Sequence, residues 1–141
     1  MFGAPPSAAP APRQSPAGRA PVVLVAEDEA SLRTMLELIL RRGGYEPLLC
    51  ADGAEAVQQI ERGARIDGAI LDLRMPRLTG EQVLARIRST RELERIPVIV
   101  TSAFNDEVQA RAALDAGATD FLPKPFSVHD LTALLERRLP R

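Results

Sequence analysis

This sequence has little of what several common protein classes depend on. Its one cysteine, Cys50, rules out an internal disulfide bond and suits a reducing, cytoplasmic location. No apolar run approaches the ~20 residues that a membrane-spanning helix needs, and the N-terminus lacks the order of basic and apolar segments found in secretory signals. The net charge of −1 gives no overall attraction to nucleic acid or to anionic membranes. These absences predict a cytoplasmic protein that neither inserts into a membrane nor binds nucleic acid directly.

Short motifs that would identify common enzymes are missing as well. The chain contains no cluster of histidine and cysteine for zinc, no G-x-x-x-x-G-K or G-x-G-x-x-G phosphate loop and no G-x-S-x-G serine motif. Its only histidine, His129, lies apart from the other polar residues described below, which favours a surface position. Any chemistry must therefore come from other residue types.

The first 21 residues differ in composition from the rest of the chain. Residues 1–21 contain six of the 12 prolines and few large apolar side chains, so they cannot bury enough surface to offset the entropy of ordering them. We expect this segment to be a disordered tail or linker, partly of polyproline type. Residues 22–139 alternate short apolar runs with stretches of helical period, which predicts one folded domain of ~120 residues.

The predicted domain consists of five repeats of a strand followed by a helix. The expected strands are 22–26, 47–50, 68–72, 98–102 and 121–122, and the expected helices are 31–42, 54–61, 81–89, 106–116 and 127–139. Apolar runs without alternation are typical of strands buried on both faces, as in a parallel sheet covered by helices. Pro47 cannot donate to a ladder, which places its strand at an edge. Right-handed crossovers then predict a doubly wound α/β fold.

Helix caps and inward-facing positions can also be predicted. Ser31 is expected to cap the first helix, which would turn Leu32 and Met35 inward together with residues further along. The last helix is expected to turn Val128 and Leu131 inward.

Polar side chains that do not belong in a core stand at the ends of four strands. They are Glu27 and Asp28 after the first strand, Asp72 at the end of the third, Ser102 at the end of the fourth and Lys124 after the last. In a parallel sheet these ends share one edge, where ligands of doubly wound folds bind. Carboxylates suit Mg²⁺, whereas a hydroxyl and an ammonium group suit phosphoryl oxygens. The converging carboxylates would repel one another, so at least one should have a raised pKa when no cation is bound.

Each of these residues also has a simpler explanation when it is considered alone. Lys124 is the only lysine among 18 basic residues and could persist by chance in an arginine-rich composition. The Ser102 hydroxyl could merely satisfy the end of a strand. Their joint placement at one edge is what favours a site for a divalent cation and a phosphoryl group.

In order and spacing, these segments resemble the receiver domain of bacterial two-component response regulators. The matching segments are Val-Ala-Glu-Asp-Glu at 25–29, Leu-Asp-Leu-Arg-Met-Pro at 71–76 with Gly80, Pro-Val-Ile-Val-Thr-Ser-Ala at 97–103 and Gly-Ala-Thr-Asp-Phe-Leu-Pro-Lys-Pro-Phe at 117–126. The resemblance covers residues 21–139, which is the whole predicted domain. It implies a flavodoxin-like (βα)5 fold with five parallel strands in the order 2-1-3-4-5 and helices on both faces.

The resemblance implies a role for each acidic residue of the predicted site. Asp72 would be the phosphoacceptor. Asp28 and Asp72 would bind Mg²⁺ directly, Glu27 would bind it through water, and Arg74 would contribute its backbone carbonyl. The chain would then be a phosphoacceptor that assists its own phosphorylation and dephosphorylation, and not an enzyme.

The resemblance also implies how a signal would leave the site. Ser102 would bind the phosphoryl group and reorient, and Phe121 would turn inward as Ser102 moves. Lys124 would pair with Asp72 or with the phosphoryl group, across a cis bond to Pro125. The donor would be a histidine kinase or a histidine phosphotransferase, and a downstream protein would recognise the changed surface. A homodimer through the last two helices is one form that this output could take.

Three alternatives remain open at this point. The chain could be the receiver module of a hybrid histidine kinase, which its proline-rich start would suit, although Met1 favours a stand-alone regulator. It could be an aspartyl-phosphate hydrolase, but such phosphatases use an acid two places after the nucleophile, where this chain has Arg74. It could be an interaction module that is never phosphorylated, which the complete set of acids, hydroxyl and lysine argues against.

Overall fold

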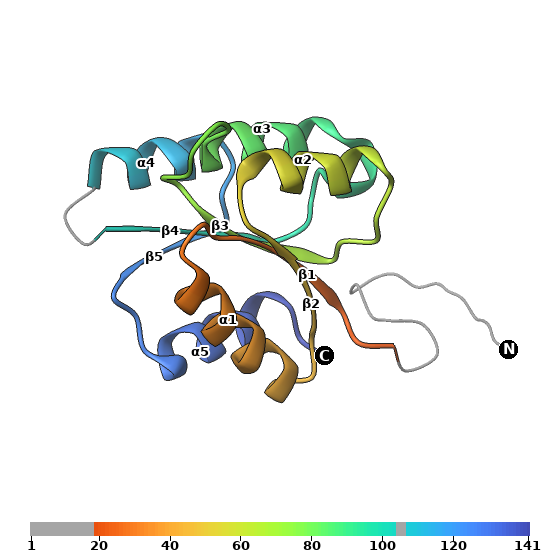
Figure 1. Ribbon diagram of the computed structural model, residues 1–141, viewed down its shortest axis with the longest axis vertical. Helices are drawn as coiled ribbons and strands as arrows, with labels where there is room; N and C mark the ends of the chain where they lie inside the picture. Colours follow the sequence, from red (N-terminus) through yellow and green to blue (C-terminus); the bar gives the residue numbers. More distant parts are fainter. Residues whose placement is uncertain (1–18, 104–106) are drawn as a thin grey trace, which may run out of the picture.

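The computed structural model describes residues 19–103 and 107–141 (Figure 1). The elements in chain order are β1 (Val22–Ala26), α1 (Ala30–Arg42), β2 (Glu46–Cys50), α2 (Gly53–Glu61), β3 (Gly68–Asp72), α3 (Gly80–Ser89), the 3-10 helix η2 (Arg91–Leu93), β4 (Val98–Ala103), α4 (Glu107–Asp115), β5 (Asp120–Lys124) and α5 (Val128–Arg138). The expected tail falls mainly on residues 1–18, which lie outside the described part, so that expectation stays a prediction.

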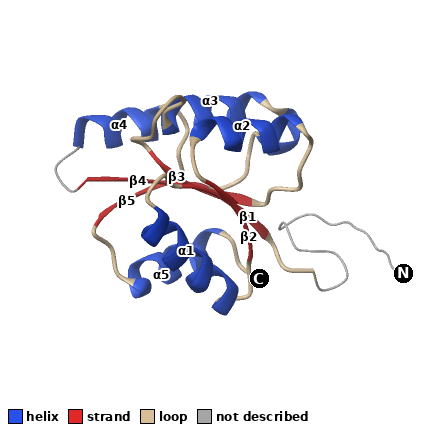
Figure 2. Ribbon diagram, in the orientation of Figure 1, coloured by secondary structure: helices blue, strands red, loops and turns tan. Residues whose placement is uncertain are grey.

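The five strands form one parallel sheet in the order β2-β1-β3-β4-β5, which confirms the predicted flavodoxin-like fold. Helices α1 and α5 cover one face of the sheet, and α2, α3 and α4 cover the other (Figures 1 and 2). Pro47 lies in β2 at an edge of the sheet, where a missing N–H costs no ladder bond, as expected.

The strands supply two hydrophobic clusters, one on each face of the sheet. Leu24 and Leu71 pack on the face covered by α2 and α3, whereas Val25 and Ile70 pack on the face covered by α1 and α5. All five residues of β3 are buried. Because both faces are covered, every position of the central strand is apolar until its last residue, Asp72, reaches the edge of the sheet.

The predicted start of α1 and the predicted inward position of Val128 are wrong. Helix α1 begins at Ala30 with Glu29 at its N-cap, and the Ser31 hydroxyl donates to the Glu29 carboxylate (2.9 Å) instead of capping the helix. Val128, the first residue of α5, is 54% exposed, whereas Leu131 one turn later is buried as expected. The Ser127 side chain caps this helix by accepting from a backbone N–H one turn later.

No helix within residues 19–103 and 107–141 combines the length and the apolar character that crossing a bilayer would require.

The close approach of α3 to the end of β3 requires glycine at position 80. A Cβ added to Gly80 would lie 2.5 Å from the Asp72 carbonyl oxygen and 2.8 Å from the Leu73 Cα, both backbone atoms. We expect Gly80→Ala to lower the free energy of unfolding by about 2–3 kcal/mol, because backbone cannot yield as a side chain can. Urea denaturation measures this.

The matched control is Gly43→Ala at the end of α1, where the added Cβ would meet the Tyr45 ring at 3.3 Å. Its effect should be the smaller of the two, since a side chain can shift by a few tenths of an ångström. Equal losses in the two variants would show that the contact with the end of β3 is not tight.

Candidate functional site

The candidate site lies at the carboxyl edge of the sheet, where the structure brings together all the predicted strand-end residues. Asp72 is the last residue of β3 and pairs in register with Thr101 of β4, next to Ser102. Lys124 is the last residue of β5, so it ends the strand and does not follow it, and it pairs with Ala103. The register of the parallel strands therefore sets where each of these residues lies at the carboxyl edge of the sheet.

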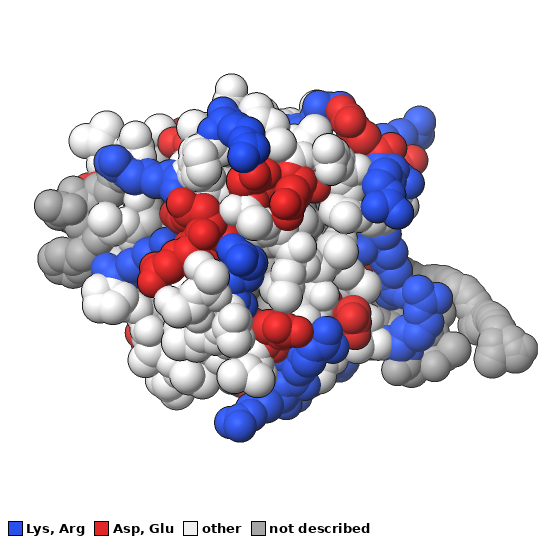
Figure 3. Space-filling view, viewed as in Figure 1, with Lys and Arg blue, Asp and Glu red and all other residues white. Residues whose placement is uncertain are grey.

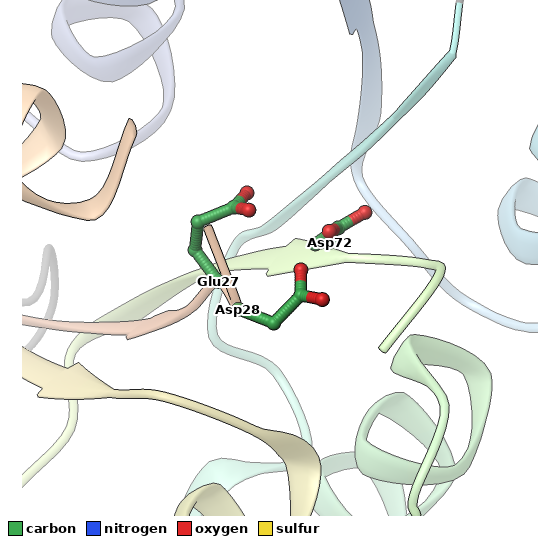
Figure 4. A group of neighbouring side chains, drawn as sticks. All are labelled: Glu27, Asp28 and Asp72. Carbon is green, nitrogen blue, oxygen red and sulfur yellow. The ribbon is translucent and has the colours of Figure 1, made fainter. Parts of the chain in front are cut away.

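Three carboxylates form a cluster at the ends of β1 and β3 (Figure 4). Glu27, Asp28 and Asp72 each offer an oxygen, and these oxygens all lie within 4.8 Å of one another. Glu27 and Asp72 are buried, with 2% and 4% of their surface exposed, whereas Asp28 is exposed. The cluster is open to solvent on the Asp28 side, so an ion held there could keep some of its water.

The Lys124 ammonium group joins two of these carboxylates. Its Nζ lies 3.1 Å from Glu27 Oε1 and 3.3 Å from Asp72 Oδ2, and the side chain is 25% exposed. Burial alone would lower the pKa of Lys124, but the two neighbouring carboxylates raise it above its usual value. The peptide bond from Lys124 to Pro125 is cis, as the resemblance implied.

The pKa values of the buried carboxyl groups are raised, which confirms the expectation from the sequence. Burial is the largest cause for both Glu27 and Asp72. For Glu27 the charge of Asp72 adds to it, and for Asp72 a hydrogen bond with Asp28 does so. Repulsion among the acids, which was the reason expected from the sequence, is therefore the smaller cause.

Backbone N–H groups hold the carboxylates in position. The Arg74 N–H donates to Asp72 Oδ1 (3.1 Å), and the Glu29 N–H donates to Glu27 Oε2 (3.0 Å). The Arg33 guanidinium on α1 donates to the Glu27 carbonyl oxygen (2.7 Å). The contributions of Glu29 and Arg33 were missed from the sequence, because no pattern of residue types marks a backbone contact of this kind.

A cavity of about 760 Å³ opens beside Asp72. Its lining residues are Glu29, Ser31, Leu32, Met35, Asp72, Arg74, Ser102, Ala103, Lys124, Pro125 and Phe126. Figure 3 shows acidic side chains gathered near the middle of one face of the molecule, with basic side chains among them. The cavity thus places a carboxylate, a hydroxyl and an ammonium group within reach of one ligand.

The structure also shows where two further residues named by the resemblance lie. Phe121 in β5 is half-buried and packs against the cluster beneath α2 and α3. Arg74 is exposed and lines the cavity. Its backbone N–H donates to Asp72 Oδ1, and the role of its carbonyl stays a prediction.

Comparison with curated proteins gives consistent matches. The sequence profile of the response regulator receiver domain matches residues 23–136. The chain is 38% identical to the response regulator MprA of Mycobacterium leprae and 39% identical to that of Mycobacterium avium, in each case over 119 residues. These residues are 84% of this chain and 51% of each relative, so the chain spans about half the length of the curated relatives it matches.

Solved structures of similar sequence share the fold. One is the receiver domain of the sensor histidine kinase PA1611 from Pseudomonas aeruginosa, with a magnesium ion coordinated in its active site cleft. It is 34% identical with a TM-score of 0.77, and the alignment covers 86% of this chain and 99% of that one. The chemotaxis response regulator CheY4 of Vibrio cholerae is 31% identical with a TM-score of 0.79, over 85% and 99% of the two chains.

Proposed function

Because this chain belongs to the receiver domain family of response regulators, which are signalling modules, we propose that it accepts a phosphoryl group on Asp72 and thereby switches a protein-interaction surface. One observation carries the proposal: the Lys124 ammonium group lies within 3.3 Å of the Asp72 carboxylate, in the cavity that Ser102 also lines. A carboxylate nucleophile beside a cation and a hydroxyl donor is what phosphoryl transfer requires.

In the proposed reaction an Asp72 oxygen attacks phosphorus in line with the departing group. Lys124 would neutralise charge on the equatorial oxygens as a compact point charge. The Ser102 hydroxyl would donate to one of these oxygens. The backbone N–H of Arg74 already holds Asp72 Oδ1, which leaves Oδ2, beside Lys124, as the oxygen nearer the cation. The chain would thus assist its own modification by positioning and charge alone.

The acidic cluster also fits Mg²⁺. Asp28 and Asp72 would hold the ion directly, Glu27 through water, and Arg74 through its backbone carbonyl. The fit rests on three carboxylates with oxygens within 4.8 Å of one another and one side open to solvent, because Mg²⁺ prefers oxygen ligands and retains several waters. When bound, the ion would neutralise negative charge on the phosphoryl oxygens.

Magnesium should stabilise the protein in a pH-dependent way. The folded-state pKa values of Glu27 and Asp72 are raised above their ordinary values of 4.5 and 3.8. Without divalent ions, the stability these groups contribute is therefore fully present below about pH 4 and is lost as the pH rises through the raised values. Mg²⁺ binds the deprotonated groups. At neutral pH and a Mg²⁺ concentration of 100 Kd, it should therefore raise the free energy of unfolding by about 2.7 kcal/mol. Near pH 4 the groups are protonated, so the gain should be much smaller.

Thermal unfolding followed by circular dichroism, with and without MgCl2 at each pH, measures this difference. A chelator should reverse the gain at neutral pH. A gain of equal size at both pH values would contradict binding to these carboxylates.

The phosphorylated state would be recognised through a changed surface. Phosphorylation adds charge and acceptor oxygens at Asp72, and Ser102 and Phe121 would follow it in a shift between two packings. Apolar side chains stand exposed on the last two helices, with Val108 83% and Val128 54% exposed, which suits a downstream protein or a second copy of the chain.

The partners and the extent of the domain belong to the same proposal. The donor would be a histidine kinase or a histidine phosphotransferase, with residues 22–139 as the receiver domain and residues 1–21 as a tail or linker. The 34% identity to the receiver domain of a sensor histidine kinase keeps a hybrid kinase as an alternative setting. Arg74 is exposed where an aspartyl phosphatase would need an acid, which disfavours a hydrolase.

Direct phosphorylation by a small donor tests the proposal. The protein is incubated with acetyl phosphate and MgCl2, its intact mass is measured, and the modified residue is located by peptide mapping. We expect a single phosphoryl adduct on the peptide that contains Asp72, and none when a chelator removes the divalent ion. The absence of an adduct in the presence of MgCl2 would overturn the proposed function.

A further inference from the structure

The cavity at the site is lined by two chemically different groups of residues. Asp72, Ser102 and Lys124 are the polar residues that the proposed reaction uses. Leu32, Met35 and Phe126 are an apolar group, to which nothing above assigns a task, and the polar residues Glu29 and Ser31 line the cavity beside Leu32 in the sequence. At about 760 Å³ the cavity is within the range of small-molecule sites and is larger than a phosphoryl group needs.

The apolar lining residues are held in place by packing against the protein core. Leu32 and Met35 are three residues apart on α1 and therefore share one face of the helix. Phe126 lies in the connection between β5 and α5 and lines the same cavity. All three are half-buried and pack against the cluster beneath α1 and α5. Packing on one side holds these side chains in place while their remaining apolar surface lines the cavity.

The geometry of transfer brings a leaving group into this cavity. The new bond forms between an Asp72 oxygen and phosphorus, and the bond from phosphorus to the acyl oxygen breaks on the opposite side. The carboxylate of the donor departs with that electron pair. The departing group therefore points away from the Asp72 oxygen, in a cavity whose lining includes Leu32 and Met35.

We infer that this cavity binds the apolar acyl group of a small acyl phosphate, so that the chain selects among small phosphoryl donors in favour of those with an aryl or a longer alkyl group. The occupant carries an anionic phosphate for Lys124 and an apolar body for Leu32 and Met35, which matches the charge and the polarity of the two groups of lining residues. The inference rests on the proposed function, because Asp72 must be the acceptor.

The test compares benzoyl phosphate with acetyl phosphate, whose leaving carboxylates have similar basicity. The second-order rate of adduct formation is measured by intact mass for each donor in the presence of MgCl2. We expect wild type to prefer benzoyl phosphate by on the order of tenfold, because a partly buried apolar group is worth about that much. Leu32→Ala and Met35→Ala should each reduce this preference several-fold.

The control variant is Leu38→Ala, since Leu38 is a 54% exposed leucine of α1 that does not line this cavity. It should leave both rates unchanged. A second measurement needs no transfer: benzylphosphonate, an unreactive probe, should shift the NMR signals of the Leu32 and Met35 methyl groups more than methylphosphonate does. This measurement uses wild type and so does not depend on the folding of a variant.

The outcomes separate the two proposals. If acetyl phosphate modifies Asp72 but the preference for benzoyl phosphate is absent, or is the same in Leu32→Ala as in wild type, the inference fails and the proposed function stands. If neither donor modifies the protein, the proposed function fails and the inference fails with it.

Discussion

An Asp72→Asn variant should take up no phosphoryl group from acetyl phosphate under conditions in which wild type is fully modified. The amide that replaces the carboxylate is a poor nucleophile and carries no negative charge for Lys124 to orient. The variant should nevertheless fold. Burial raises the pKa of Asp72, so its charged form costs stability at neutral pH, and a neutral group of the same shape avoids that cost.

Two readouts distinguish loss of the acceptor from loss of structure. The intact mass reports the adduct, and the thermal midpoint without divalent ions should be no lower in Asp72→Asn than in wild type. Asp120→Asn is the matched control, because Asp120 lies in β5 and pairs with Arg138, a residue that does not line the site cavity. It should keep the wild-type rate of modification. Modification of Asp72→Asn at the wild-type rate would place the phosphoacceptor elsewhere.

The sheet was predictable because its strands are buried on both faces. The apolar run of β3 and the polar residue that ends it occur together in the sequence, so the strand and its last residue, Asp72, could be predicted with the same bounds that the structure shows. Pro47 indicated an edge strand because it lacks an N–H group, which is a property of that residue alone. The residue types within each strand reflect its own burial and hydrogen bonding, so the sequence pattern was sufficient to predict the strands.

Helix boundaries were less predictable because several residues compete for one cap. Asp28, Glu29 and Ser31 can each accept from a backbone N–H, yet α1 begins at Ala30 with Glu29 at its N-cap and no capping hydrogen bond from that side chain. The exposure of Val128 likewise depends on its position within the helix. Its apolar character matches the inward face, but it lies in the first turn of α5 and is 54% exposed.

The contacts that join distant segments could not be predicted from sequence patterns. The Tyr45 hydroxyl donates to the Leu139 carbonyl oxygen (2.6 Å) and so ties the start of β2 to the end of α5. The Arg88 guanidinium donates to the Gly117 carbonyl oxygen (2.7 Å), which joins α3 to the turn after α4. Both acceptors are backbone atoms, which carry no signature in the sequence.

The same limit applies to the candidate site. The residues of the site could be predicted because each lies at the end of a strand or directly after it. The placement of the Lys124 ammonium group between Glu27 and Asp72 could not, because it depends on distances across the sheet. The apolar residues that line the cavity could not be predicted as such either. Leu32 was expected to face the core, and it is in fact half-buried, with its remaining surface toward the cavity.

Replacing Lys124 should slow phosphoryl uptake by about 100-fold, since a single preorganised charge at a developing oxyanion is worth about that much. Lys124→Met keeps the length of the side chain and removes the charge. Lys124→Arg keeps the charge but substitutes a planar group, which does not match a space 3.1 Å from Glu27 and 3.3 Å from Asp72. We therefore expect Lys124→Arg to restore little of the lost rate.

A second consequence of Lys124→Met concerns the pH dependence of stability. Without the ammonium group the pKa values of Glu27 and Asp72 should rise further, because Lys124 lowers both in wild type. Stability without divalent ions should then fall over a wider range of pH above the ordinary carboxyl values than it does in wild type. Urea denaturation at several pH values measures this range.

Arg111→Met on the exposed surface of α4 is the matched control, because it removes one positive charge away from the site cavity. It should change neither the rate of uptake nor the pH dependence. A wild-type rate in Lys124→Met would show that the ammonium group does not act on the phosphoryl oxygens. The contact with Asp72 would then be structural, and the assignment of Lys124 to the reaction would have to be given up.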